Sequence, residues 1–357
     1  LVNYFPYATP PPTDGSAFAA RMEMAECPWN PANRLVRIAI QGKEMPKRER
    51  PPCNLVFLVD VSGSMAEPNK LPLVKTALRM LLEELDGRDQ VSMVVYAGAS
   101  GLVLPPTRCS NKAVIRQAID ALDAGGSTNG AAGIQLAYLQ AREAFVQGGA
   151  NRVILCTDGD FNVGVTDESQ LIALIQEKAK SGVFLTALGF GRGNLKDAML
   201  EKLADKGNGV HGYVDSEKEA RKLFVEQVSG TLVTIAKDVK LQVEWNPTRV
   251  AAYRLLGYEN RLLAKEDFHD DKKDAGDIGA GHAVTAFYEV VPAGAPAPTG
   301  VVDPLRYQTA PTLSDAAMSA EILTLKIRHK APDADTSRLQ AFRLEEPGAV
   351  AFGAASE

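Results

Sequence analysis

The sequence predicts an α/β fold with a doubly wound, Rossmann-like and mostly parallel sheet, inserted in a β-sandwich that the two flanks build together. From Leu55 to Ala236, short apolar runs alternate with amphipathic stretches, which is typical of a parallel sheet covered by helices on both faces. In the flanks, apolar and polar residues alternate with period two, which indicates antiparallel strands with one solvated face.

The α/β region contains nearly continuous hydrophobic runs, LVFLVD, RVILCTD and GVFLTALG, as expected of central parallel strands. Between the runs, apolar residues recur at helical spacing, for example at Val74, Leu78 and Leu81. We therefore expect strands at 55–60, 91–97, 152–157, 183–189 and 211–214. Helices are expected at 70–86, 111–123, 131–147, 167–181, 195–206 and 216–236.

The flanks contribute strands that we expect at 33–42, 237–245, 283–291 and 321–330. Strand 33–42 has no evident partner nearby in sequence, so we expect it to pair with strands that follow residue 237. The charged, proline-rich stretch KEMPKRERPPC leads from the first flank into the α/β region. The predicted domains are 1–50, an N-terminal segment of the sandwich, 51–236, the α/β domain, and 237–357, the C-terminal β-rich part.

The composition is that of an ordinary soluble protein: 357 residues, 45% hydrophobic, with a net charge of −5. The negative charge argues against nonspecific binding to nucleic acid or to anionic membranes. No window approaches the roughly 18 to 20 consecutive apolar residues of a transmembrane helix. The N-terminus lacks the layout of a signal peptide, and we expect the chain to be a processed piece whose targeting segment lies upstream.

Four cysteines, Cys27, Cys53, Cys109 and Cys156, show no CxxC spacing, which argues against zinc. Cys156 lies inside an apolar run and is expected to be a small core residue. Cys27 and Cys53 flank the same junction, and whether they pair in an oxidising compartment stays open.

Three oxygen-rich loops follow the predicted strands. DVSGS carries Asp60, Ser62 and Ser64, GGSTNG carries Thr128, and TDGDFN carries Asp158. In an open parallel sheet, ligands collect at the carboxyl ends of the strands, where these loops meet. Taken singly, each residue fits a helix cap or a turn. The convergence of three such loops on one sheet edge favours a binding site.

The chemistry of this set favours a hard divalent cation, Mg²⁺ or alternatively Mn²⁺ or Ca²⁺, because all the candidate ligands are oxygens. Asp60 and Asp158 would be ionised at neutral pH and would balance the charge of the metal. If neutral hydroxyls dominate its coordination, the metal stays electrophilic and favours an acidic group from outside as its last ligand.

These loops resemble the three motifs of the metal-ion-dependent adhesion site (MIDAS) of von Willebrand factor type A (VWA) domains, in the family's order, over residues 55–236. The flanking segments VNYFPY, CPWNP, RLVRIAIQG and DAGDIGAGHAVTAFYEV resemble the bacterial YfbK-like VWA proteins, which are often predicted to be envelope lipoproteins. The resemblance implies a cell-envelope, periplasmic or surface-anchored location, with the cytoplasm as the alternative.

The resemblance also implies a non-enzymatic module for protein binding or adhesion. Ser62, Ser64 and Thr128 would coordinate the metal directly, and Asp60 and Asp158 mainly through water. A protein partner would supply an Asp or Glu to complete the coordination. In some members, a shift of the metal ligands moves the last helix, which here would be 216–236.

Asp160 and Asn162 follow the third motif and are expected on the rim that faces a partner. Two other functions remain open. The strand before Asp60 also resembles the start of Mg²⁺-dependent phosphatases, but these need a second aspartate where this chain has Ser62. The other alternative is a structural scaffold with a vestigial metal site.

Overall fold

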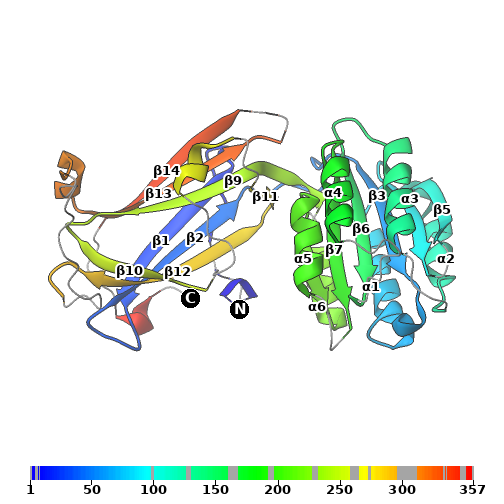
Figure 1. Ribbon diagram of the computed structural model, residues 1–357, viewed down its shortest axis with the longest axis horizontal. Helices are drawn as coiled ribbons and strands as arrows, with labels where there is room; N and C mark the ends of the chain where they lie inside the picture. Colours follow the sequence, from blue (N-terminus) through cyan, green and yellow to red (C-terminus); the bar gives the residue numbers. More distant parts are fainter. Residues whose placement is uncertain are drawn as a thin grey trace. The chain divides into compact units, whose positions relative to one another are not determined.

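The computed structural model of the protein divides into two compact units, an α/β unit and a β-sandwich unit (Figure 1). The α/β unit is Met45–Thr234, and the sandwich unit joins Leu1–Glu44 to Ile235–Glu357. The structure describes residues 2–4, 7, 9–97, 100–125, 130–159, 168–191, 197–226, 232–257, 265–271, 275–295, 312–332, 334, 336–345 and 351–355.

A six-stranded sheet in the order β5-β4-β3-β6-β7-β8 forms the centre of the α/β unit. Its strands are β3 (Cys53–Asp60), β4 (Gln90–Tyr96), β5 (Ser100–Arg108), β6 (Ala150–Thr157), β7 (Val183–Phe190) and β8 (His211–Val214). All are parallel except β5, which pairs with β4 in the antiparallel sense. Every residue of β3 is buried, as its continuous apolar run predicts. Strand β5 was not predicted because it contains two prolines, which an edge strand tolerates.

Helices cover the sheet on both faces, in agreement with the predicted fold class. They are α1 (Leu71–Glu84), α2 (Lys112–Asp120), α3 (Gly130–Glu143), α4 (Glu168–Ala179), α5 (Asp197–Lys206) and α6 (Glu217–Arg221). Val56 and Leu58 of β3 share one core with Ile134 of α3 and Leu171 of α4. Helix α1 contacts α2 and α6. The sheet is therefore held between two hydrophobic layers.

The predicted helix 216–236 is confirmed at its start and wrong at its end, while 227–231 lies outside the described residues. Helix α6 ends at Arg221, a π-helical turn follows over Lys222–Glu226, and strand β9 already begins at Thr234. The β-branched residues at the start of β9 pack well on a pleated sheet and are less favourable in a helix.

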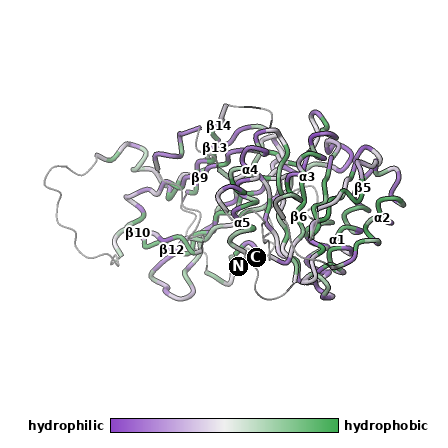
Figure 2. The backbone as a smooth tube through the Cα atoms, turned by 45° about the vertical axis from the view of Figure 1, so that its right-hand side comes forward, coloured by the Kyte–Doolittle hydropathy of each residue, from purple (hydrophilic) through white to green (hydrophobic). Residues whose placement is uncertain are grey.

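Two four-stranded antiparallel sheets, β1-β2-β12-β10 and β11-β9-β13-β14, form the sandwich unit. Their strands are β1 (Phe18–Glu26), β2 (Arg34–Gly42), β9 (Thr234–Trp245), β10 (Val250–Leu256), β11 (Gly276–Gly279), β12 (Ala283–Pro292), β13 (Glu321–Lys330) and β14 (Ser337–Glu345). Buried and half-buried residues alternate along β13. Figure 2 shows hydrophobic and hydrophilic residues intermixed along the labelled strands of this unit.

The predicted long-range pairing is confirmed, since β2 pairs with β12 and Val36 lies opposite Tyr288. The expectation that β2 has no nearby partner is wrong, because β1 precedes it by the connection 27–33 and pairs with it. Strands β1, β10, β11 and β14 were not predicted, since their residues are mostly half-buried or exposed and alternate less clearly. The Phe18 ring of β1 meets the His329 ring of β13 at 5.1 Å, which joins the two sheets.

All four cysteines are buried and free, so Cys27 and Cys53 form no disulfide. Burial raises the pKa of Cys53 and of Cys109 to about 12, which keeps both thiols protonated. Among the described residues, no helix is long and apolar enough to cross a membrane.

Candidate metal centre

Asp60 is the last residue of β3 and is completely buried at the carboxyl edge of the sheet. Its Oδ1 accepts a hydrogen bond from the backbone N–H of Ser62 at 2.9 Å. Its Oδ2 accepts from the hydroxyl of Tyr96 at 3.2 Å and from Thr157 Oγ1 at 3.1 Å. The neighbouring strands β4 and β6 thus supply the donors that fix the orientation of this carboxylate.

Burial raises the pKa of Asp60 above its ordinary value, and the negative charge of Asp158 acts in the same direction. The hydrogen bonds from Ser62 and Thr157 partly oppose this rise, because they stabilise the ionised form. A divalent cation nearby would favour the ionised form further.

Ser62 and Ser64 lie at the start of the short 3₁₀ helix η2 (Gly63–Ala66), which follows β3. Their Oγ atoms are 3.0 Å apart, as the i, i+2 spacing in a turning loop predicts. Ser62 is buried and Ser64 is exposed, so the pair extends from the sheet edge towards the solvent. Each hydroxyl keeps lone pairs that can coordinate a cation.

Asp158 follows β6 directly and is almost completely buried. Thr157 connects the turn around Asp158 to Asp60. Its hydroxyl donates to Asp60 and accepts a hydrogen bond from the backbone N–H of Gly159, on the other side of Asp158, at 3.2 Å. Gly159 has a φ of +90°, a conformation that a side chain would strain, and it lets the chain turn sharply after Asp158.

The structure brings four of the five predicted metal ligands, Asp60, Ser62, Ser64 and Asp158, to one edge of the sheet. Thr128 lies outside the described residues, as do the predicted rim residues Asp160 and Asn162. The loop before Thr128 is described as far as Gly125, whose backbone N–H donates to Val61 O at 2.7 Å. This bond places Gly125, the first residue of GGSTNG, beside the first loop.

Lys70 is a member of the site that the sequence did not predict. Its Nζ lies 3.2 Å from Asp158 Oδ2 and 3.0 Å from Ser64 O. Burial alone would lower the pKa of Lys70, but the hydrogen bond and charge of Asp158 raise it above its ordinary value. In sequence, Lys70 resembles any solvated lysine before a helix, and no local pattern shows that its side chain returns to the sheet edge.

The residues present fit a hard divalent cation. Two carboxylates and two hydroxyls supply an all-oxygen set of the kind that Mg²⁺ and Ca²⁺ prefer. Among the described residues, no three His, Cys, Asp or Glu side chains gather as a metal cluster. A metal bound at this edge would therefore use the hydroxyl oxygens of Ser62 and Ser64 beside the two carboxylates.

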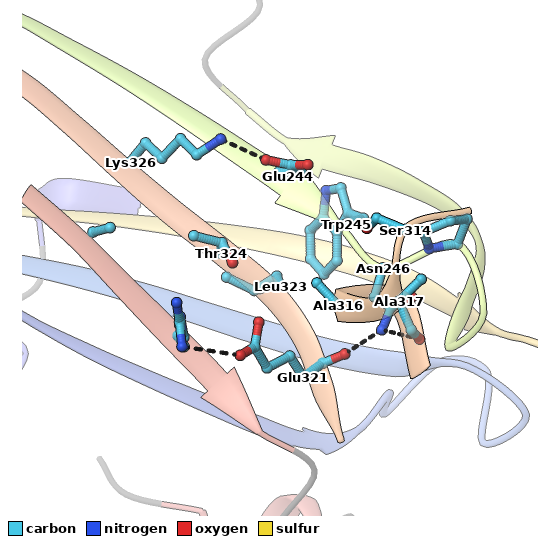
Figure 3. A pocket seen from close by; sticks show the side chains of 13 residues that line it. Glu244, Trp245, Asn246, Ser314, Ala316, Ala317, Glu321, Leu323, Thr324 and Lys326 are labelled. Atoms are coloured by element: carbon cyan, nitrogen blue, oxygen red, sulfur yellow. Dashed lines mark hydrogen bonds and ion pairs between the residues drawn. The ribbon is translucent and has the colours of Figure 1, made fainter. Parts of the chain in front are cut away.

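A second hollow, of about 330 Å³, lies in the sandwich unit near Trp245 (Figure 3). Its charged residues are paired with each other: Lys326 with Glu244 at 2.6 Å, and Arg343 with Glu321 at 3.3 Å. The carboxylates in this hollow are therefore paired with basic side chains that line the same hollow.

Comparisons with known proteins agree with this fold. The von Willebrand factor type A domain family matches residues 54–227, and the family described as "Uncharacterized protein YfbK, C-terminal" matches residues 230–356. A family described as von Willebrand factor matches residues 1–37. The chain therefore belongs to the VWA domain proteins and carries a C-terminal domain of the YfbK type.

Relatives extend over different parts of the chain. The Escherichia coli K12 protein "Uncharacterized protein YfbK" is 43% identical over 351 residues, covering 96% of this chain and 60% of the relative. Human inter-alpha-trypsin inhibitor heavy chain H4 is 31% identical over 199 residues, covering 51% of this chain and 21% of the relative. The chain thus spans 60% or less of the length of both relatives.

Among solved structures, "von Willebrand factor type A from Catenulispora acidiphila" has a TM-score of 0.52 at 16% identity, covering 92% of this chain and 72% of that chain. This likeness supports the fold alone. VWA domains are typically protein-binding or adhesion modules, and they often bind a divalent metal at a MIDAS.

Proposed function

We propose that this chain is a divalent-metal-dependent protein-binding or adhesion module that recognises an acidic group of its partner. Asp60, Ser62, Ser64, Thr128 and Asp158 would hold Mg²⁺, with Mn²⁺ or Ca²⁺ as alternatives. The bound metal would supply an electrophile that accepts a carboxylate oxygen from an Asp or Glu of the partner. Asp160 and Asn162 would line the rim and contribute to specificity.

One observation carries this proposal: two carboxylates and two hydroxyls meet at the carboxyl edge of the sheet, with their orientation fixed by hydrogen bonds. Ser62 and Ser64 are neutral ligands, so a metal held by them keeps more of its charge for an outside ligand than one held by carboxylates alone. The site therefore favours binding of an anionic group.

The same residues favour binding over catalysis. A phosphatase of the related sequence pattern requires a second aspartate as acid or base, and this chain has Ser62 at that position. His211 is the first residue of the short strand β8 and does not belong to any of the three loops, while His269, His282 and His329 belong to the sandwich unit. We therefore propose a non-enzymatic role. We place it at the cell envelope because the resemblance of the flanking segments to YfbK-like proteins implies that location.

Isothermal titration with Mg²⁺, Mn²⁺ and Ca²⁺ tests the metal site. We expect binding by the wild-type protein and a loss of at least tenfold in affinity for Ser64→Ala, which removes an exposed hydroxyl and leaves the buried core intact. Thr76→Ala, which removes a hydroxyl on the surface of α1, is the matched control. An absence of metal binding both by the wild-type protein and by a variant in which Lys70 is made neutral would leave only the vestigial scaffold.

A pull-down from cell-envelope extracts tests partner binding. We expect capture of a partner in Mg²⁺, and its loss with EDTA and with Thr128→Ala, while circular dichroism shows an intact fold. Capture that is insensitive to EDTA would place the interface elsewhere on the molecule.

A further inference from the structure

Lys70 reaches the candidate metal centre along a defined path. Its backbone is fixed at the start of α1, because its N–H donates to Glu67 O at 3.0 Å and its carbonyl accepts from the Val74 N–H at 2.8 Å. From there the side chain passes over Gly191, which follows β7, and its ammonium reaches Asp158 after β6.

Gly191 leaves the space for this path. A Cβ atom added at Gly191 would lie 3.0 Å from Cε and 3.1 Å from Cγ of Lys70, closer than ordinary contacts. The side chain of Lys70 is only 14% exposed. The lysine is therefore packed in place over the sheet edge, and its ammonium is not a freely moving surface charge.

The ammonium has two carboxylates within reach. Asp158 Oδ2 lies at 3.2 Å and is nearly buried, while Glu67 Oε1 lies at 3.4 Å on a side chain that is 62% exposed. Asp158 is also a predicted ligand of the metal. A divalent cation that approaches Asp158 therefore meets a positive charge on the same carboxylate oxygen, and Glu67 offers the ammonium another partner on the solvent side.

We propose that Lys70 is an internal competitor of the divalent cation, and that it limits metal affinity until its ammonium moves from Asp158 towards Glu67. This inference rests on the proposed function, because it assumes that the cation binds at this sheet edge. Lys70 acts on the metal indirectly, through its contact with Asp158. The centre therefore binds metal only when the concentration of divalent cation is high.

Titration of Mg²⁺ into matched variants measures the competition. We expect Lys70→Met, which keeps the packing over Gly191, and Lys70→Gln to raise Mg²⁺ affinity by about tenfold, the order of magnitude for removing one like charge from a partly solvated site. Lys70→Arg keeps the charge and is expected to bind Mg²⁺ no more tightly than the wild type. Lys75→Met removes the same charge from α1 away from the site and is the control.

A double-mutant cycle tests the role of Glu67. Glu67→Gln should lower Mg²⁺ affinity more in the wild-type background than in Lys70→Met. Only the wild-type background has the Lys70 ammonium, which loses Glu67 as its alternative partner. Equal effects in both backgrounds would contradict the movement towards Glu67.

The outcomes separate the two proposals. Metal binding by the wild type that is unchanged in Lys70→Met and Lys70→Gln would overturn the competition and leave the metal site standing. No binding by either the wild type or Lys70→Met would overturn the metal site and the competition together. Binding that becomes detectable only in the neutral variants supports both.

Discussion

Arg50 and Asp89 form a buried, bidentate ion pair at the start of the α/β unit, with Nη1–Oδ1 and Nη2–Oδ2 distances of 2.9 and 2.6 Å. Their side chains are only 3% and 0% exposed. Asp89 also accepts hydrogen bonds from the backbone N–H groups of Cys53 and Asp86, both at 2.8 Å. The pair therefore ties the segment before β3 to the turn before β4.

Asp89→Ala is expected to destabilise the α/β unit by about 3–5 kcal/mol, because it leaves a buried guanidinium without its partner. Urea unfolding followed by circular dichroism at 222 nm measures this unit, since all the described α-helices belong to it. Asp120→Ala breaks the exposed pair of Asp120 with Arg79 and should cost less than about 1 kcal/mol. Similar losses in both variants would show that burial of the pair is unimportant.

Thr157 is predicted to tune the metal centre without touching the metal. Thr157→Val keeps the shape of the side chain but removes the donor to Asp60 Oδ2 and the acceptor for Gly159 N–H. Loss of a group that orients a ligand typically lowers metal affinity 10–100-fold. Titration calorimetry with Mg²⁺ measures the change, and an unchanged affinity would show that Tyr96 and Ser62 suffice to orient Asp60.

Asp238 is predicted to be essential to the sandwich. Its carboxylate lies 3.1 Å from the ammonium of Lys240, whose side chain is fully buried, and 3.0 Å from that of Lys330. Asp238→Ala should destabilise the unit by about 3–5 kcal/mol, because the buried ammonium of Lys240 then loses this carboxylate, while the Asp270 carbonyl still accepts a hydrogen bond from it. Lys326→Ala, which breaks a partly exposed pair with Glu244, is the control and should cost about 1 kcal/mol or less.

Tryptophan fluorescence reports on the sandwich alone, because both tryptophans, Trp29 and Trp245, lie in that unit. A urea midpoint of fluorescence that is the same for Asp238→Ala and the wild type would contradict the prediction. Fluorescence and circular dichroism together therefore separate the stabilities of the two units.

The sequence predicts the central strands and the metal residues because both depend on local patterns. A continuous apolar run that ends in DVSGS defines β3 and places Asp60, Ser62 and Ser64 without knowledge of the rest of the fold. Lys70 and Arg50 could not be predicted in the same way. Their roles depend on contacts with Asp158 and Asp89, which lie 88 and 39 residues away in the chain.

An edge strand and the end of a helix were likewise not predictable from local sequence. Strand β5 contains prolines that are acceptable only because it lies at a sheet edge, and the helix predicted at 216–236 gives way to β9, whose pairing with β13 is a long-range property. Local patterns identify the parallel strands of the α/β unit and the alternating sandwich strands β2, β9, β12 and β13. The edge strand β5 and the remaining sandwich strands are decided by tertiary pairing.

His329 is predicted to make the stability of the sandwich depend on pH. Its ring packs edge-on against Phe18, and its Nδ1 is buried without a hydrogen-bond partner among the described residues. Burial lowers the pKa of His329 below its ordinary 6.5, and the charge of Arg338 adds to this. As the pH falls below 6.5, the unfolded chain takes up a proton before the folded one, so stability present above pH 6.5 is lost, by at most about 1.4 kcal/mol per pH unit. Fluorescence-monitored urea unfolding at pH 7.5 and 5.5 should show a larger loss of unfolding free energy for the wild type than for His329→Leu. The other histidines are the same in both proteins, so the difference reports on His329. Equal losses would mean that His329 is protonated as easily in the folded sandwich as in the unfolded chain.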